Sequence, residues 1–305
     1  MITIDEANEF LIHQLKFANW KEVIQRNKLE FLKLLVPYYA HNIYFQNITL
    51  TSIPASERKV PDEKAIIVAG LNGIGGNCIT QNSFLDLLLK SLGFDSSIIS
   101  GTVHCGESTT TNNHVLVVVR LSPNELYLLD LGVGVPFPEP IPLHNLPYIH
   151  RAVGHRIMYR KSTNDFYECV QLDGTLMGEK YEDNETEFVR YDFTLNPRTI
   201  DFFNEPLHLI FTDPERSVFF EGPLLFRYFT ENENGQMLDD AQLTGDRKFI
   251  LIRGDDILIG TNETKLHRIV TDYEDTKATI LKYFPRLSKE NVEKSLDFFN
   301  KKRFV

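Results

Sequence analysis

The periodicity of apolar residues changes along this chain, and that change most restricts the folds the chain can adopt. In the first third, apolar side chains recur at helical spacing, most clearly at Phe84, Leu87, Leu88 and Leu92. From about Ile98 the pattern becomes that of strands, and the last third mixes both patterns. Helices first, a sheet next and a mixed segment last predict an α+β protein.

The helical third contains several start and stop signals. We expect Asp5 to cap a first helix and a second helix to end near Pro37. Residues 54–77 are rich in glycine towards their end and are predicted to form a loop. The helix expected over residues 80–92 is followed by Gly93, which suits a left-handed C-terminal cap.

The rest of the chain is predicted from runs of apolar residues. Strands are expected over residues 115–119 and 126–131, around a turn at 121–125, and strand-like segments continue to about residue 195. Further expected elements are a strand at 249–252 and helices at 277–284 and 290–299.

Charge and cysteine content exclude several classes of protein. The chain of 305 residues carries a formal net charge of -10, which disfavours binding to a nucleic-acid backbone. It has no apolar stretch near the roughly 20 residues that span a membrane and no visible signal peptide. Three cysteines do not suggest a disulfide framework. We therefore expect a cytoplasmic protein without a membrane, nucleic-acid or obligate protein partner.

Cys78 stands between a glycine turn and the strong helix. The first N–H groups of a helix are unpaired and the helix dipole is positive there, so a cysteine at this point is favoured as a reactive thiolate. The same N–H groups can stabilise an oxyanion. A buried structural cysteine beside a glycine turn would give the same local pattern.

His114 and Asp130 lie at the start and end of two successive predicted strands. If these strands form a hairpin with Arg120 opposite Leu126, both side chains point to one face, as diagonal neighbours roughly 7–8 Å apart. Asp130 lies within an apolar run, where an unpaired charge is costly. Cys, His and Asp together predict a thiol nucleophile, a proton-transferring imidazole and an orienting carboxylate.

Several segments resemble motifs of the arylamine N-acetyltransferase family. Gly75-Gly76-Asn77-Cys78 with Asn82 is similar to its Arg-Gly-Gly-x-Cys-x-Glu-x-Asn region. His114 and the run from Asp130 to Gly134 resemble the family's histidine strand and Asp-x-Gly-Phe-Gly motif. The segments 44–48 and 212–219 are also similar to family segments, in the same order.

The resemblance implies an architecture and a reaction. The architecture is an N-terminal helical bundle over residues 1–95, a central antiparallel β-barrel-like domain over 96–200 and a C-terminal α/β lid over 201–305, with a triad core like that of cysteine proteases. The reaction is ping-pong transfer of acetyl from acetyl-CoA, through Cys78, to an aromatic amine or hydrazine, without a metal. The glycine turn would help to bind the oxyanion.

The resemblance also suggests contact residues. Coenzyme A would contact Thr110, Thr111, Thr212 and Ser217, and the acceptor would contact Phe45, Val133 and Phe137. Four positions depart from the family pattern, namely Gln46, Ile74, Thr80 and Val133. With Val133, and without an arginine soon after Gly134, we expect a more apolar acceptor site.

Other hypotheses stay open at this point. The same triad could serve an amide synthase or a thiol hydrolase. A non-catalytic relative could bind coenzyme A or an aromatic ligand. A metal site of His104, Cys105 and His114 lacks a usual zinc spacing and a fourth ligand.

Overall fold

The fold was analysed in a computed structural model of the chain. It describes residues 1–104, 110–134, 139–163, 165–172, 187–231, 237, 247–261, 267–270 and 272–303.

The described elements follow the order that the sequence predicts. The helical region contains α1 (Ile4–Glu9), η1 (Phe10–Gln14), α2 (Trp20–Arg26), α3 (Lys28–Asn42), β1 (Phe45–Gln46), α4 (Ile48–Thr51), η2 (Ala55–Glu57), α5 (Glu63–Leu71) and α6 (Cys78–Ser91). The central region contains β2 (Asp95–Val103), β3 (His114–Ser122), β4 (Glu125–Leu129), β5 (Ile141–Pro142), β6 (Tyr148–Ala152), β7 (His155–Lys161), β8 (Tyr167–Gln171) and β9 (Phe188–Arg198). The last region contains η4 (Ile200–Phe203), α7 (Asn204–Thr212), η5 (Val218–Phe220), β10 (Leu224–Phe229), β11 (Lys248–Arg253), β12 (Asp256–Thr261), β13 (His267–Val270), α8 (Tyr273–Tyr283) and α9 (Lys289–Arg303).

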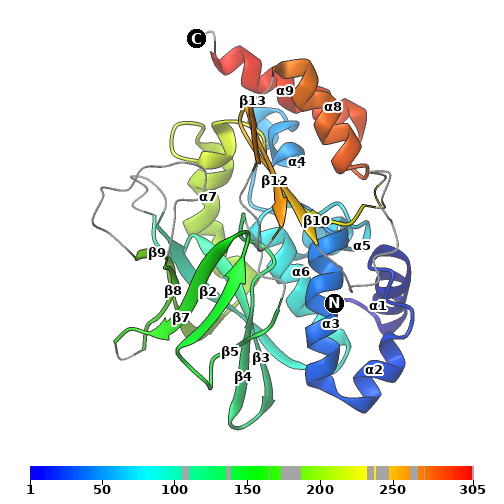
Figure 1. Cartoon of the computed structure of the whole chain (residues 1–305), viewed down its shortest axis with the longest axis vertical. Helices are drawn as coiled ribbons and strands as arrows, with labels where there is room; N and C mark the ends of the chain where they lie inside the picture. The colour runs from blue at the N-terminus through cyan, green and yellow to red at the C-terminus, as the bar shows by residue number, and fades with distance from the viewer. Residues whose placement is uncertain are drawn as a thin grey trace.

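A strongly curved antiparallel sheet occupies the centre of the chain (Figure 1). In the described residues its eight strands run in the order β5-β4-β3-β2-β9-β8-β7-β6. β2 pairs with β3 on one side and with β9 on the other, so strands distant in sequence become neighbours. The sheet is nearly closed and resembles a barrel, which confirms the predicted α+β class.

Helix α6 connects the helical region to this sheet. It packs against β2 and β3 on one side and against α5 on another. Its residues Phe84, Leu85, Leu88 and Leu89 have no exposed surface, so both faces of this part of the helix are in the core. Because α6 begins at Cys78, its packing fixes the start of the helix against the sheet.

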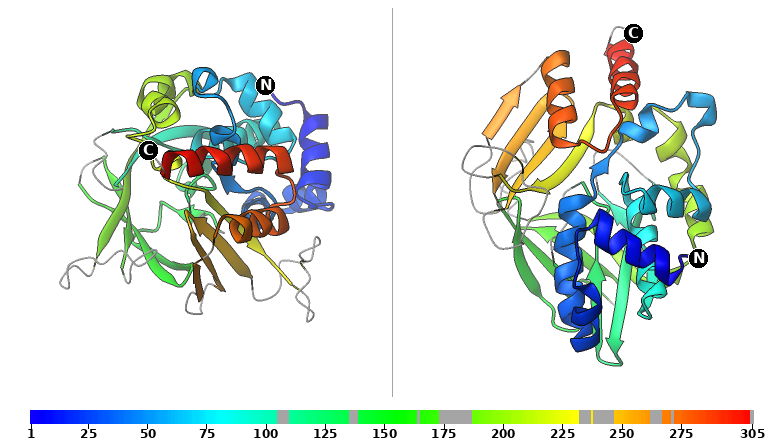
Figure 2. Two further views of the ribbon diagram at one scale, coloured as in Figure 1. Left: turned by 90° about the horizontal axis from the view of Figure 1, so that it is seen from above. Right: turned by 90° about the vertical axis from the view of Figure 1, so that its right-hand side faces the viewer.

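A smaller sheet with the order β1-β10-β11-β12-β13 crosses from the first region to the last. Strand β1 pairs with β10, with Phe45 opposite Phe226. Helices α8 and α9 pack together at the end of the molecule opposite the β3–β4 hairpin (Figures 1 and 2). The Thr51 and Ser295 hydroxyl groups, 2.6 Å apart, join α4 to α9.

Two helix boundaries differ from the prediction. Thr3, not Asp5, caps α1: the Thr3 hydroxyl accepts from the Glu6 N–H, and the Glu6 carboxylate accepts from the Thr3 N–H. This reciprocal capping box satisfies two donors that Asp5 alone would leave open. Pro37 lies inside α3 rather than at its end. A proline removes one helical hydrogen bond, and the buried residues that follow it keep α3 folded.

The loop predicted over residues 54–77 contains helix α5, so that prediction was wrong. Asp62 caps this helix by accepting from the Ala65 N–H. The glycines that suggested a loop have another role, because a Cβ on Gly70 would lie 2.0 Å from Cδ2 of Phe84. Gly70 therefore permits the close packing of α5 on α6.

No helix in the described part of the chain has the length and apolar character needed to cross a membrane.

Asn47 joins the helical region to the segment before β10 and offers a test of this fold. Its side chain donates to the carbonyl groups of Phe219 and Gly222, both at 2.8 Å, and accepts from the Leu224 N–H at 2.8 Å. Asn47→Ala should lower the free energy of unfolding by about 2–4 kcal/mol, because one buried and two partly buried backbone groups lose their hydrogen bonds.

Denaturant unfolding measures this effect. The matched control is the exposed Asn124, whose replacement by Ala should change stability by less than about 0.5 kcal/mol. Equal effects of the two substitutions would show that Asn47 does not tie the sheet together.

Candidate active site

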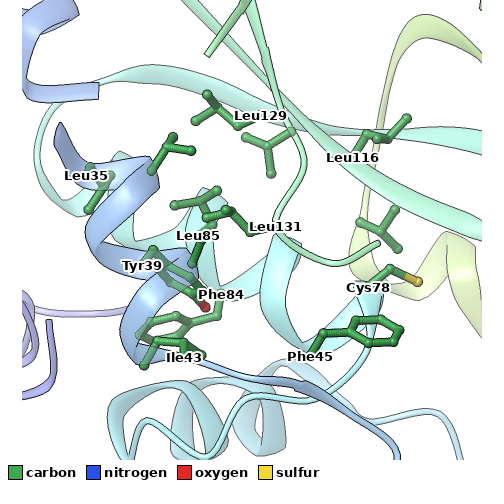
Figure 3. Close-up of a cluster of buried hydrophobic side chains, with 14 of the residues drawn as sticks. Leu35, Tyr39, Ile43, Phe45, Cys78, Phe84, Leu85, Leu116, Leu129 and Leu131 are labelled. Carbon is green, nitrogen blue, oxygen red and sulfur yellow. The ribbon is translucent and has the colours of Figure 1, made fainter. Parts of the chain in front are cut away.

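Cys78 is the first residue of α6 and lies at the edge of the main core. Figure 3 shows it beside buried apolar side chains, with its sulfur pointing away from Leu85 and Leu131. Cys78 is 7% exposed and forms no disulfide. Its sulfur lies 4.0 Å from the carbonyl oxygen of Asn113, in the turn that leads into β3. The helix N-terminus places positive potential at this sulfur, as the sequence predicted.

The glycine turn before Cys78 is tied to β1. Gly75 and Gly76 have positive φ angles of 76° and 145°, and a Cβ on Gly75 would lie 2.0 Å from the Tyr44 carbonyl oxygen. The Gly76 N–H donates to that same oxygen at 3.0 Å. This N–H is therefore occupied, which corrects the expectation that the whole turn is available to an oxyanion. The Cys78 N–H, at the first helical position, lacks an intrahelical acceptor.

His114 and Asp130 meet as the hairpin register predicts. Arg120 lies opposite Leu126 and Val117 opposite Leu129, so the register continues to place Asp130 beside the first residues of β3. The His114 Nε2 atom lies 2.9 Å from Oδ2 of Asp130, and both residues are 3% exposed. With Nε2 bound to Asp130, Nδ1 is the ring nitrogen left for Cys78.

The electrostatics of this pair favour the charged forms. Burial by itself lowers the pKa of His114, but the Asp130 charge and hydrogen bonds to Asp130 and Cys78 outweigh it and raise the pKa to about 10. Burial by itself raises the pKa of Asp130, but the His114 charge and hydrogen bonds from His114, Asn82 and Tyr191 lower it below its ordinary value. The site thus holds a charged imidazole beside a charged carboxylate.

Asn82 links the three parts of the site, and the sequence analysis did not assign it a role. It lies one helical turn after Cys78 and is fully buried. Its Nδ2 donates to Oδ1 of Asp130 at 2.9 Å and to the Val115 carbonyl oxygen at 2.6 Å. Its Oδ1 accepts from the Leu131 N–H at 2.9 Å. The spacing of four residues from Cys78, which puts both on one helix face, was the available signal.

Gly132 brings the Asp130 segment into contact with Cys78. A Cβ on Gly132 would lie 2.4 Å from Cα of Cys78, so no other residue fits at this position without movement. The Gly132 N–H also donates to Oδ1 of Asp130 at 3.2 Å. This contact sets the separation of nucleophile and carboxylate.

Tyr191 approaches the site from β9 and was also missed. It is fully buried, its ring centroid lies 5.3 Å from that of His114, and its hydroxyl oxygen lies 2.9 Å from that of Tyr159. No local sequence signal connects it to Asp130, because the pairing of β9 with β2 brings it there.

The structure describes two of the three residues that were predicted to contact the acceptor, Phe45 and Val133. Phe45 is 4% exposed, and its ring lies 3.6 Å from the position of a Cβ on Gly134. Val133, next to Gly134, is half-buried against the same core as Phe45. The Phe219 ring, which the sequence analysis did not include, lies 6.2 Å from that of Phe45. Phe137 lies outside the described residues.

The residues predicted to contact coenzyme A occupy two separate segments. Thr110 and Thr111 precede Asn113, whose carbonyl group faces Cys78. The Thr212 hydroxyl donates to the His208 carbonyl at 2.8 Å, and the Ser217 hydroxyl accepts from the Phe219 N–H at 3.3 Å. Both hydroxyl groups thus have local partners, and Ser217 is additionally connected to the Phe45 region through Phe219.

The neutral residues that replace charges of the family pattern have their own partners. Gln46 is 1% exposed and exchanges two hydrogen bonds with Thr49, of 2.9 Å and 3.0 Å. Thr80 packs against Gly76.

Of the residues considered for a metal, His104 pairs with Asp192, and Cys105 lies outside the described residues. Within the described residues, no group of three metal-ligating side chains is suitably placed.

The sequence profile of a known enzyme family matches residues 28–284, and its description is N-acetyltransferase. Among curated proteins, an N-malonyltransferase of Gibberella moniliformis is 28% identical over 134 residues, which are 40% of this chain and 39% of that protein. The match thus spans well under half the length of that relative. An arylamine N-acetyltransferase of Felis catus is 26% identical over 204 residues, which are 62% of this chain and 77% of that protein.

Solved structures share the fold. An arylamine N-acetyltransferase of Nocardia farcinica matches with a TM-score of 0.72 at 18% sequence identity. The match covers 96% of this chain and 95% of the Nocardia chain. The Mycobacterium marinum arylamine N-acetyltransferase in complex with CoA matches with a TM-score of 0.65 at 18% sequence identity. The match covers 88% of this chain and 92% of the Mycobacterium chain.

Gly132→Ala should separate Cys78 from Asp130, because the new methyl group would lie 2.4 Å from Cα of Cys78. We expect a loss of about 1–3 kcal/mol of stability and slower alkylation of Cys78 by iodoacetamide. Gly134→Ala is the matched control, since its nearest neighbour is Phe45 at an ordinary 3.6 Å. A Gly132→Ala protein as stable and reactive as the control would contradict the close contact.

The raised pKa of His114 predicts a pH-dependent contribution to stability. The unfolded value is about 6.5, so the contribution is complete below about pH 6.5 and is lost as pH rises towards the folded value of about 10. The lowered pKa of Asp130 adds a loss below about pH 4. The difference in Tm between wild type and His114→Gln should therefore shrink from pH 6.5 to pH 10.

The exposed His13 provides the control for this measurement. His13→Gln should give a Tm difference from wild type that varies little over the same pH range. A constant difference for His114→Gln would show that the His114–Asp130 pair does not stabilise the charged imidazole.

Proposed function

We propose, from the premise that this chain belongs to the arylamine N-acetyltransferase family, that it transfers an acyl group from acyl-CoA to an aromatic amine or hydrazine through Cys78. The observation that carries this proposal is the buried contact of the Asp130 carboxylate with His114, which directly follows Asn113, the residue whose carbonyl oxygen lies 4.0 Å from the Cys78 sulfur. Acetyl is the default acyl group, as the family description states.

The geometry supports a reaction in two half-steps. The Cys78 sulfur attacks the thioester carbonyl carbon, a sulfur–carbon bond forms, and the coenzyme A thiol leaves with the proton that His114 supplies. The amine nitrogen then attacks the acyl-cysteine, His114 removes the proton from nitrogen, and the Cys78 thiolate is restored. Asp130 keeps the imidazole in the required tautomer and orientation.

The oxyanion formed in each half-step needs donors beside Cys78. The Cys78 N–H is the candidate, because the Gly76 N–H is bound to Tyr44. Thr110, Thr111, Thr212 and Ser217 stay our candidates for coenzyme A, and Phe45 and Val133 for the acceptor. A solved family member is in complex with CoA, which supports coenzyme A as the carrier.

Malonyl is the second acyl group to test, because one curated relative is named an N-malonyltransferase. The relation is limited to part of that protein, so the relative suggests a candidate donor only. A thiol hydrolase and a non-catalytic binding protein are the outcomes that the following experiment separates from acyl transfer. The cytoplasmic location stays a prediction.

The test is an intact mass measurement after incubation with acetyl-CoA or malonyl-CoA. Wild type should gain the mass of one acyl group, whereas Cys78→Ala should gain none, because the thioester to Cys78 cannot form. Addition of an arylamine should discharge the acyl-enzyme and give the N-acyl product. Cys169→Ala is the matched control, since Cys169 is fully buried and should leave the adduct unchanged in mass.

Each other outcome points elsewhere. An adduct on Cys78→Ala would remove Cys78 from the reaction. Discharge by water at the same rate with and without amine would indicate a hydrolase. Binding of acyl-CoA without an adduct on wild type would indicate a binding protein and would overturn the proposal.

A further inference from the structure

The carbonyl group of Gly76, two residues before the thiol, is held by two donors. The Gln46 N–H donates to it from β1 at 3.1 Å, and Nε2 of Gln81 donates to it from α6 at 2.8 Å. Gln81 is 1% exposed, and its bond to Gly76 is buried. Because water does not compete for a buried hydrogen bond, this carbonyl group has a fixed direction.

Gln81 also binds the next carbonyl group along the chain. Its backbone N–H donates to the Asn77 carbonyl oxygen at 3.0 Å, at the start of α6. The side chain and the backbone of one residue therefore hold two successive carbonyl groups. A peptide unit is planar and trans, so the direction of its carbonyl group sets the opposite direction of its N–H group. The direction of the Cys78 N–H is thus set through Gln81.

The segment before Cys78 depends on such bonds because its own residues restrain it weakly. Gly76 has a φ angle of 145°, and a glycine without tertiary bonds can adopt many other conformations. Asn77 is the N-cap residue of α6, but its side chain makes no capping hydrogen bond. The usual local restraint at a helix start is therefore missing, and the side chain of Gln81 restrains the backbone instead.

We propose that Gln81 is a positioning residue for the acyl transfer, and that it holds the backbone on both sides of Asn77 so that the Cys78 N–H is aimed at the oxyanion. The inference rests on the proposed function, in which the Cys78 sulfur adds to a carbonyl carbon. In this addition a sulfur–carbon bond forms and the π electrons of the carbonyl group move onto its oxygen. When the carbonyl group forms again, the bond to the leaving group breaks.

An N–H group that already points to the developing charge stabilises the transition state without a cost for reorganisation. Gln81 does not touch the acyl group and acts through the backbone. Its bonds are also separate from those of the imidazole and the carboxylate, because Asn82, its neighbour on α6, is the residue that bonds to Asp130. Loss of the Gln81 amide should therefore impair addition to a carbonyl group and leave the His114–Asp130 contact in place.

The experiment compares two reactions of Cys78 in the full chain. p-Nitrophenyl acetate acylates a thiol through an oxyanion, and the initial release of p-nitrophenolate reports the rate. Iodoacetamide alkylates the same thiol by displacement of iodide from a saturated carbon, so no oxyanion forms. The variant is Gln81→Met, which keeps the length of the side chain and removes its N–H donors. The matched control is Ser96→Ala, which removes another buried hydrogen bond of α6, from Ser96 to Oδ1 of Asp86 at 2.7 Å.

Gln81→Met should acylate about 10- to 100-fold more slowly than wild type at saturating ester. Loss of an oxyanion donor costs about 100- to 1,000-fold, and a misdirected donor keeps part of its effect. The ester concentration that gives the half-maximal rate should stay unchanged, because the interaction belongs to the transition state. Alkylation should stay within about 2-fold of wild type, because it follows the thiolate character of Cys78. Ser96→Ala should keep both rates, whatever its Tm.

Several results would overturn the inference. One is equal slowing of both reactions in Gln81→Met, which would indicate a general displacement of the thiol. Others are a wild-type acylation rate in Gln81→Met and a difference of the same size between the two reactions in Ser96→Ala. If Gln81→Met does not fold, Gln81→Leu is measured in the same way. Failure of both variants to fold, while Ser96→Ala folds, would limit Gln81 to stability and reject the positioning role.

Incubation of the same proteins with acetyl-CoA and malonyl-CoA, followed by intact mass, separates this inference from the proposed function. Slow ester acylation in Gln81→Met, without an adduct from either acyl-CoA on wild type, would keep the role of Gln81 and reject acyl-CoA as the donor. An adduct from acyl-CoA, with equal ester acylation in wild type and Gln81→Met, would keep the proposed function and reject the role of Gln81. A wild type that no donor acylates would reject both.

Discussion

The buried carboxylate of Asp130 is the constraint on which the rest of the structure depends. An isolated charge in this core would be unstable, so the fold has to bring donors to it. They come from three places, namely His114 on β3, Asn82 on α6 and the Gly132 backbone, and Tyr191 on β9 packs against the His114 ring. Satisfying one carboxylate therefore fixes a helix and a hairpin relative to one another. The Cys78 thiol is placed by the same arrangement, since Cys78 and Asn82 share a helix face.

Apolar packing and small residues make this arrangement possible. Helix α6 is buried between α5 and the large sheet, where Gly70 lets α5 approach Phe84. At the other end of the site Gly132 allows the Asp130 segment to reach the Cys78 backbone. In both places the absence of a side chain sets a distance that a methyl group would prevent. The Cys78 thiol then lies at the edge of the core, where the partial exclusion of water strengthens electrostatic interactions.

Residues that depart from the family pattern leave this core of interactions intact. Gln46 is satisfied by Thr49, and Thr80 packs on Gly76, so neither needs the charges that the family has at these positions. Neither residue contributes to the contacts among Cys78, His114, Asp130 and Asn82. The departures therefore lie in the surroundings of the thiol and leave the contacts of His114, Asp130 and Asn82 in place.

By itself, the sequence determined the α+β order and the helix that begins beside Cys78, because these depend on local periodicity and turn chemistry. It permitted the hairpin register that joins His114 to Asp130, and the structure has that register. The sequence led to a wrong prediction where glycine has two uses. The glycines before Cys78 suggested a loop, but Gly70 lies in helix α5 and allows it to pack closely on α6. Only the tertiary structure decided that Asn82 bonds to Asp130 and that Tyr191 packs against His114. Those contacts arise from long-range strand pairing and from the need to satisfy a buried charge, and neither leaves a pattern in the local sequence.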